Sequence, residues 1–182
     1  DLMHLGIFLD AHAVAGDAHL LTQVRDNLQA FTLDSDVQVA RFAAAVDAFG
    51  SPASWWGRLL GRDGAEQVNL KKAGLFPIVH GVRSLALAQG IGATSTAERL
   101  DALVAQQVLD PKLGQELQES LYFLMGLRLQ AGLHEWALHR PISGNVDPST
   151  LSSLERDLLK DTLAVVKRFK AVLHQRLRLD LV

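Results

Sequence analysis

The sequence contains no cysteine and carries little net charge. None of its 182 residues is a cysteine, so disulfide bonds and thiol chemistry are excluded. This composition is compatible with a reducing cytoplasm, where we expect the protein to reside. The formal net charge is -2 at pH 7. A chain so close to neutrality has no general attraction for nucleic acid or acidic membranes, so any polyanion site must be a local patch.

Long hydrophobic runs are also missing. No apolar segment approaches the roughly 20 residues that a membrane span requires. The first residues lack the basic-then-apolar order of a signal peptide. We therefore expect neither membrane insertion nor a nucleic-acid partner.

Complete catalytic motifs are absent as well. The sequence has no phosphate-binding GxxxxGK[ST], no GxGxxG and no GxSxG. The stretch HEWALH at residues 134–139 resembles the zinc motif HExxH but has one residue too many. That spacing turns the two histidines about 140° apart on a helix, so we reject it as a metal site. No metal or cofactor is expected in this chain.

What the sequence does contain is helical periodicity. Hydrophobic residues make up 48% of the chain and charged residues 21%, enough to bury a core. Apolar side chains recur at helical spacing, and capping boxes at Ser95 and Ser152 and an Asp-Pro pair at Asp110 mark helix starts. The prediction is an all-α bundle of about six helices, over residues 17–31, 35–49, 77–89, 96–107, 110–139 and 152–179.

The segment GIFLDAHAVAGD at residues 6–17 does not fit this bundle. Its short apolar run and its Gly16-Asp17 turn favour a strand from about Leu5 to Val14. A lone strand has no partner, and the first residue is Asp1 rather than Met. Either the strand prediction is wrong or residues 1–16 belong to something larger, with residues 17–182 forming the helical domain.

Two arginines fall on apolar helix faces. Arg128 lies seven residues after Leu121 on a leucine stripe, and Arg83 lies between Val79 and Ala86. A buried guanidinium group requires a carboxylate, backbone carbonyls or an anionic ligand. The sequence leaves two alternatives for these arginines. One is an internal ion pair with one of the 20 acidic residues, and the other is anion capture in a cleft.

The last helix places basic residues on one side and apolar residues on the other. The basic row can be a phosphate-binding stripe or simply the solvated side of the helix. Its members are Arg156, Lys160, Lys167, His174 and Arg178, and the apolar row opposite is Leu154, Leu158, Val165, Phe169 and Val172.

An ordered series of motifs resembles a known family. The motifs are VNLKKAGLFPIV at 68–79, VRSLAL at 82–87, TSTAERL at 94–100, LRLQ at 127–130, NVDP at 145–148, then LS at 151–152 and LLK at 158–160. They resemble the nucleotidyltransferase substrate-binding domain at the C-terminal end of bacterial signal-transduction proteins that also carry CBS or cyclic-nucleotide-binding domains. Asn69 stands where the family usually has Asp.

The resemblance also accounts for the opening segment. Ile7-Phe8-Leu9-Asp10, followed by Val14 and Gly16-Asp17, is similar to the last strand of the preceding nucleotidyltransferase domain. It implies that Asp10 is the third carboxylate of a metal-binding set whose other members lie upstream. His12 and Ala13 replace the usual Arg and Pro, and Asp10 alone cannot hold a metal. Mg²⁺ and a nucleoside triphosphate are implied only for a longer protein.

Two functional hypotheses follow. In the first, the chain is the accessory substrate-binding domain of a nucleotidyltransferase-like signalling protein, inactive alone, that presents the acceptor or the nucleotide to a catalytic domain. Its expected substrate contacts are Lys71, Arg83, Arg128 and Asn145. In the second, the chain is a non-enzymatic helical module that couples sensor domains or forms a homodimer, because an exposed apolar face favours self-association.

Overall fold

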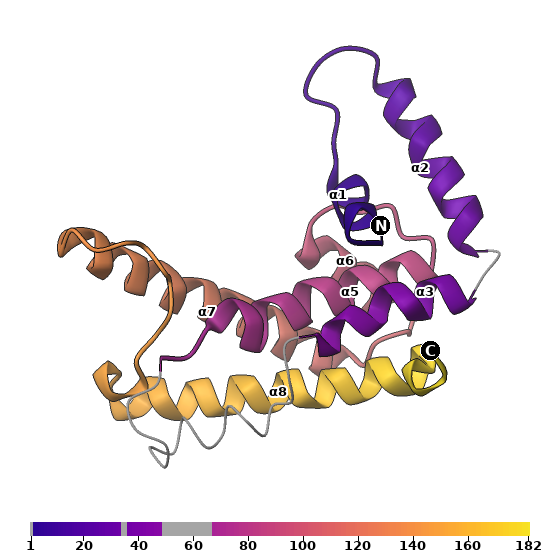
Figure 1. Ribbon diagram of the computed structural model, residues 1–182. Coiled ribbons are helices and arrows are strands. Elements are labelled where there is room, and N and C mark those ends of the chain that lie inside the picture. The colour runs from indigo at the N-terminus through magenta and orange to yellow at the C-terminus, as the bar shows by residue number, and fades with distance from the viewer. Residues whose placement is uncertain (1, 34–35, 49–66) are drawn as a thin grey trace.

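The computed structural model describes residues 2–33, 36–48 and 67–182 (Figure 1). This part of the chain is all-α, as predicted, and contains no sheet. Its α-helices are α1 (Leu2–Asp10), α2 (Ala18–Leu33), α3 (Asp36–Ala43), α5 (Phe76–Ala88), α6 (Thr96–Ala105), α7 (Pro111–Ala137) and α8 (Ser153–Leu177). The short helical turns are η1 (Ala44–Asp47), the π-helical η2 (Lys71–Leu75), η3 (Pro148–Thr150) and η4 (Leu179–Leu181).

Three of the predicted helix starts are confirmed by side-chain caps. The Ser95 side chain accepts a hydrogen bond from the Glu98 backbone N–H at the start of α6, and Asp110 does the same for the Leu113 N–H of α7. Ser152 opens α8 with a complete capping box. Such caps satisfy backbone donors that the first helical turn leaves unpaired.

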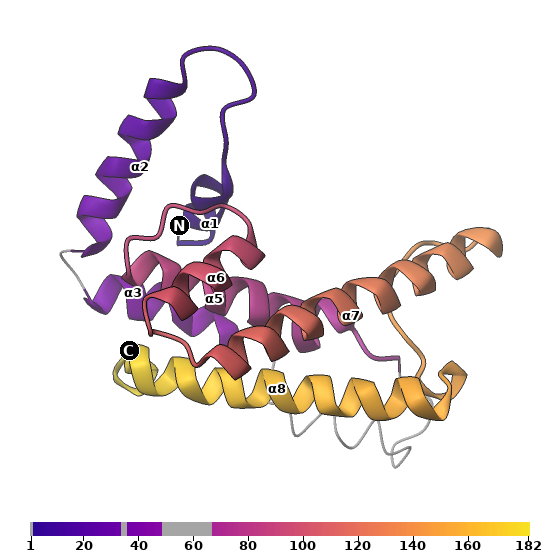
Figure 2. The same ribbon diagram turned by 180° about the vertical axis from the view of Figure 1, so that it is seen from behind.

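The hydrophobic core surrounds α5. This helix packs against α3, α6 and α8, while α7 packs against both α6 and α8 (Figure 2). Among the described residues, the side chains of the core cluster lie between Ala40 and Leu179. Gly81 of α5 lies so close to α8 that an added Cβ would be 2.5 Å from Leu173 and 2.6 Å from Phe169.

The strand predicted near the N-terminus is wrong, because residues 2–10 form helix α1. A short apolar run does not by itself distinguish a strand from a helix. A helix satisfies its backbone hydrogen bonds within the segment, whereas a strand needs a neighbour, and the described residues supply none. The boundary predicted between residues 16 and 17 stays a prediction.

The apolar row predicted for α8 is only partly buried. Leu154 and Leu158 are exposed, and the core contacts come mainly from a second row that includes Leu159, Leu163 and Leu173. Because α8 carries two apolar rows, its sequence does not show which one faces α5 and α7. The buried row lies beside the basic row on the helix, so Arg156, Lys160 and His174 are half-buried rather than on the solvated side.

A backbone pairing joins two loops at the edge of the bundle. Val68, in the segment before η2, pairs with Val146 through backbone hydrogen bonds of 2.7 and 3.0 Å, which anchors the loop after α7. Trp55 and Trp56, which begin an aromatic segment, lie outside the described residues.

Within the described residues, no helix combines the length and the apolar character needed to cross a bilayer.

Candidate functional site

Two arginines converge on the carboxylate that ends α1. Arg83 of α5 donates from Nε to Asp10 Oδ1 at 3.1 Å and from Nη2 to Asp10 Oδ2. Arg99 of α6 donates from Nη1 to Asp10 Oδ1 at 2.7 Å. Both carboxylate oxygens of Asp10 are thus held by guanidinium groups. We call Arg83 and Arg99 the arginine clamp.

Arg99 is the more buried member of the clamp, with a side chain only 2% exposed. Its Nε donates to the Ala93 carbonyl at 2.8 Å and its Nη2 to the Leu9 carbonyl at 2.9 Å. The bond to Ala93 comes from the loop before α6 and does not depend on α1, so it holds one edge of the guanidinium group in place.

The electrostatics of the clamp favour an anion. Partial burial alone would raise the pKa of Asp10, but the hydrogen bonds and positive charges of Arg83 and Arg99 outweigh it and hold the pKa below its ordinary value. Burial lowers the pKa of Arg99, yet a guanidinium stays protonated at neutral pH. Asp10 is therefore ionised between two cations.

Residues of α2 complete the surroundings. Arg25 donates to the Ala11 carbonyl, and Gln29 donates to the Gly90 carbonyl at 3.3 Å. A cavity of about 40 Å³ lies beside the clamp and is lined in part by Leu9 and Gly92. It is too small for a nucleotide but roomy enough for water. Arg25 thus adds a third guanidinium group to the surroundings of Arg99.

The structure places the four predicted substrate contacts in different regions. Arg83 lies inward, as expected, and takes the ion-pair alternative by binding Asp10. Arg128 is exposed, which contradicts the inward position expected for it. The reason is geometric, since α7 diverges from α8 towards its C-terminal end and the buried stripe passes through Leu127 (Figures 1 and 2). Arg128 instead lies against Gly144 in the following loop.

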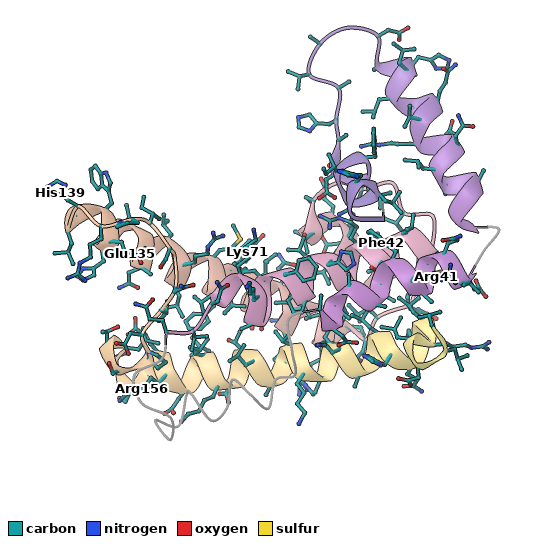
Figure 3. All side chains as sticks on the ribbon, viewed as in Figure 1. Arg41, Phe42, Lys71, Glu135, His139 and Arg156 are labelled. Carbon is teal, nitrogen blue, oxygen red and sulfur yellow. The ribbon has the colours of Figure 1, made fainter. Side chains whose placement is uncertain are left out.

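The other two residues are not close to the clamp. Lys71 is exposed at the start of η2 (Figure 3). Asn145 belongs to the loop that pairs with Val68, and its buried Oδ1 has no hydrogen-bond partner among the described residues. Arg128 and Asn145 both adjoin Gly144, whereas Arg83 lies with α1 and α6 at the other end of the molecule.

Arg99 is the site residue that sequence reasoning missed. In the sequence it belongs to the TSTAERL motif at residues 94–100. Arg99 lies four residues before Leu103, which is buried, so it falls on the apolar face of α6. A charged side chain on the apolar face of a helix is the signal that identifies Arg99, as it does Arg83.

The surroundings of Asp10 do not fit a divalent cation. A Mg²⁺ ligand needs a free carboxylate oxygen, but both oxygens of Asp10 accept hydrogen bonds from arginine. Two neighbouring guanidinium groups would also repel the metal. The described residues contain no group of three or more potential metal ligands at any other place either.

A second charged cluster connects η1 with the C-terminal end of α8. Asp47 binds Lys170 Nζ and His174 Nε2, both at 2.7 Å, and His174 Nδ1 lies 3.0 Å from Asp180. Partial burial would lower the pKa of His174, but the Asp180 and Asp47 carboxylates outweigh it and raise the pKa above its ordinary value. His174 is thus one member of the basic row of α8 that pairs with carboxylates. Lys160 is another, since its Nζ lies 3.0 Å from Asp157.

Comparison with known proteins identifies the family. No curated protein and no solved structure matches the chain. A family model described as "Putative nucleotidyltransferase substrate binding domain" matches residues 36–177, which include the whole of α3 through α8 and leave out α1 and α2. The matched region also holds nearly all of the core cluster that the structure describes. The chain therefore belongs to the nucleotidyltransferase substrate-binding domain family.

Proposed function

We propose that this chain is an accessory domain that binds an anionic group of a nucleotidyltransferase substrate at the arginine clamp. A phosphate of a nucleoside triphosphate is the group that fits best, because its oxygens can accept the same paired hydrogen bonds as a carboxylate. The chain is inactive alone. Mg²⁺ and the transfer chemistry belong to a catalytic domain elsewhere in a longer protein.

One observation carries this proposal. The two guanidinium groups of the clamp belong to the family-matched residues, whereas the carboxylate that they hold belongs to residues 1–35, outside the match. Without Asp10, Arg99 would be a buried cation facing the position of a missing anion. A domain that keeps such a position needs an anion there.

Asp10 is therefore a competitor for the substrate anion. When it leaves, Nε and Nη2 of Arg83 and Nη1 of Arg99 become free to bind a phosphate. The approach of the preceding segment and the binding of substrate then exclude each other. Arg83 is the predicted substrate contact that the proposal retains, since Lys71, Arg128 and Asn145 lie elsewhere.

The wider setting follows from the resemblance. We expect CBS or cyclic-nucleotide-binding domains and a nucleotidyltransferase domain in the same cytoplasmic protein. In such a protein, a sensor that moves the segment carrying Asp10 would control access to the clamp.

Calorimetric titration with inorganic triphosphate tests the clamp directly. Asp10→Asn is expected to strengthen binding about tenfold, because the competing charge is removed. Arg83→Ala is expected to weaken it by a similar factor. Arg168→Ala is the matched control, since Arg168 pairs with Glu116 on α7 and is remote from α1. The proposal is wrong if Asp10→Asn leaves the affinity unchanged or if Arg83→Ala binds as well as Arg168→Ala.

A further inference from the structure

Helix α7 is apolar on two faces. One face packs into the core through Leu117, Leu121, Leu124 and Leu127. The other carries five large side chains that are all more than half exposed: Tyr122, Met125, Leu129, Leu133 and Trp136. We call these five residues the outer stripe. They fall within about 80° of one another on a helix, so they form one continuous surface about 20 Å long.

We propose that the outer stripe binds the outer stripe of a second copy of this chain, with the two α7 helices antiparallel. This inference is independent of the arginine clamp. It assigns a surface to the homodimer that the sequence only suggested in general terms.

The order of residues along the stripe is the first argument. Met125 and Leu133 lie four residues on either side of Leu129, and Tyr122 and Trp136 lie seven residues on either side. A twofold axis at Leu129 therefore places Leu129 against Leu129, Met125 against Leu133 and Tyr122 against Trp136. An isologous interface requires this self-complementary pattern.

The charges at the two ends of the stripe are the second argument. Glu119 precedes the stripe and Arg140 follows it, ten and eleven residues from Leu129, and both are exposed. Arg140 lies just past the C-terminal end of α7, so an antiparallel pair brings Glu119 of one copy towards the helix end that Arg140 follows in the other. A parallel pair would place like charges together at both ends, which is unfavourable. The charge pattern thus selects the antiparallel arrangement.

The shape of α7 permits this approach. The helix diverges from α8 towards its C-terminal end, so the half that carries Leu133 and Trp136 projects from the body of the molecule (Figures 1 and 2). Glu135 holds the following loop in place by accepting hydrogen bonds from the backbone N–H groups of Ser143 at 2.8 Å and Gly144 at 3.0 Å (Figure 3). A groove of about 410 Å³ between the stripe and this loop can receive side chains of the second copy.

A glycine on one side of the stripe allows close contact. Gly126 lies three residues from Leu129, and a Cβ added there would meet no atom within 4 Å, whereas Gly132 on the other side lies against Ile142. With Leu138 and Ile142, which are also exposed, the stripe offers several hundred Å² of apolar surface. That amount is comparable with the roughly 800 Å² per partner of a standard interface.

Light scattering and sedimentation of the chain over a range of concentrations provide the first test. The chain is expected to dimerise, and Leu129→Glu is expected to raise the dimer dissociation constant at least about 30-fold, because two carboxylates would meet on the twofold axis. Leu154→Glu on α8 is the matched control, since Leu154 is 77% exposed and lies outside the stripe. A monomeric wild type, or equal effects of the two variants, would overturn the proposal.

Cysteine cross-linking tests the direction of pairing, because the natural chain contains no cysteine. Under mild oxidation, Leu129→Cys is expected to cross-link to itself. Tyr122→Cys is expected to cross-link only when mixed with Trp136→Cys. If Tyr122→Cys instead cross-links to itself, the helices are parallel and the proposal fails.

A charge exchange tests the ends of the stripe. Glu119→Arg is expected to weaken the dimer several-fold, and adding Arg140→Glu to the same chain is expected to restore it. Failure of the double variant to recover affinity, with both variants folded by circular dichroism, would overturn the antiparallel register.

Discussion

Asp10 is a single carboxylate on which two guanidinium groups depend. Asp10→Asn is expected to lower the free energy of unfolding by about 1–3 kcal/mol, because it leaves Arg99 buried without its anion. The loss is no larger because Asp10 itself is partly exposed and solvent screens its charge. Because the folded pKa of Asp10 is lowered, its contribution is present above the unfolded pKa of about 3.9 and is lost as the pH falls through the folded value. Urea unfolding at pH 7 and pH 3 measures both effects.

The control for this variant is Asp101→Asn, which changes an exposed carboxylate on the same helix as Arg99. It is expected to change the unfolding free energy by less than about 0.5 kcal/mol. If Asp10→Asn is equally mild, or if its effect is as large at pH 3 as at pH 7, the pairing with the clamp does not stabilise the protein.

His174 gives a pH dependence of opposite sign. Its folded pKa is raised, so its contribution is fully present below the unfolded pKa of about 6.5 and is lost as the pH rises through the folded value. His174→Gln is expected to cost at most about 1 kcal/mol at pH 5.5 and close to nothing at pH 9, since the site is partly exposed. Guanidinium chloride unfolding at both pH values, with exposed His12→Gln as the control, checks this.

At the scale of elements, the caps decide where helices begin. Ser152→Ala is expected to destabilise the protein by about 1 kcal/mol, because the capping box of α8 loses the side chain that accepts the Glu155 N–H. The neighbouring exposed Ser153→Ala is the control and should be neutral or slightly stabilising within the helix. Equal melting temperatures for the two variants would show that the cap contributes nothing.

The contact of α5 with α8 depends on Gly81. Gly81→Ala is expected to cost about 1–3 kcal/mol, because the new methyl group would lie within 2.6 Å of Leu173 and Phe169 in the core. Gly92→Ala is the control, since a Cβ there meets nothing within 4 Å. Thermal unfolding of both variants measures the difference, and a harmless Gly81→Ala would mean that α5 and α8 are less closely packed.

Local signals account for most of the elements. Ser95, Asp110 and Ser152 predicted the starts of α6, α7 and α8 because a helix N-terminus depends on one side chain and its nearest neighbours. The state of residues 2–10 and the burial of Arg128 depend instead on which elements pack nearby. Those relations join distant parts of the chain, so periodicity alone did not reveal them. The inward position of Arg83 was predicted from its helix face. Its pairing with Asp10 was not, because that contact joins residues 73 positions apart in the chain.

At the scale of the whole molecule, residues 1–35 supply the carboxylate at the clamp, and residues 36–182 supply the clamp arginines and the described core. The described side chains of the core cluster begin at Ala40, so a chain of residues 36–182 is expected to fold. Without Asp10 its clamp is open, and triphosphate is expected to raise its melting temperature more than that of the whole chain. Differential scanning calorimetry with and without triphosphate measures this, and equal shifts would contradict competition by Asp10.

The attachment of α1 to the clamp has a further consequence. The side-chain hydrogen bonds described for α1 join the Asp10 carboxylate and the Leu9 carbonyl to two guanidinium groups, while the described core cluster lies elsewhere in the chain. Ionic strength, acidity and competing anions can therefore loosen the N-terminal segment while the helical core stays intact. The docking of α1 on the clamp and the folding of the core are thus two equilibria that respond to different conditions. A change in salt or pH can shift the docking equilibrium without unfolding the core.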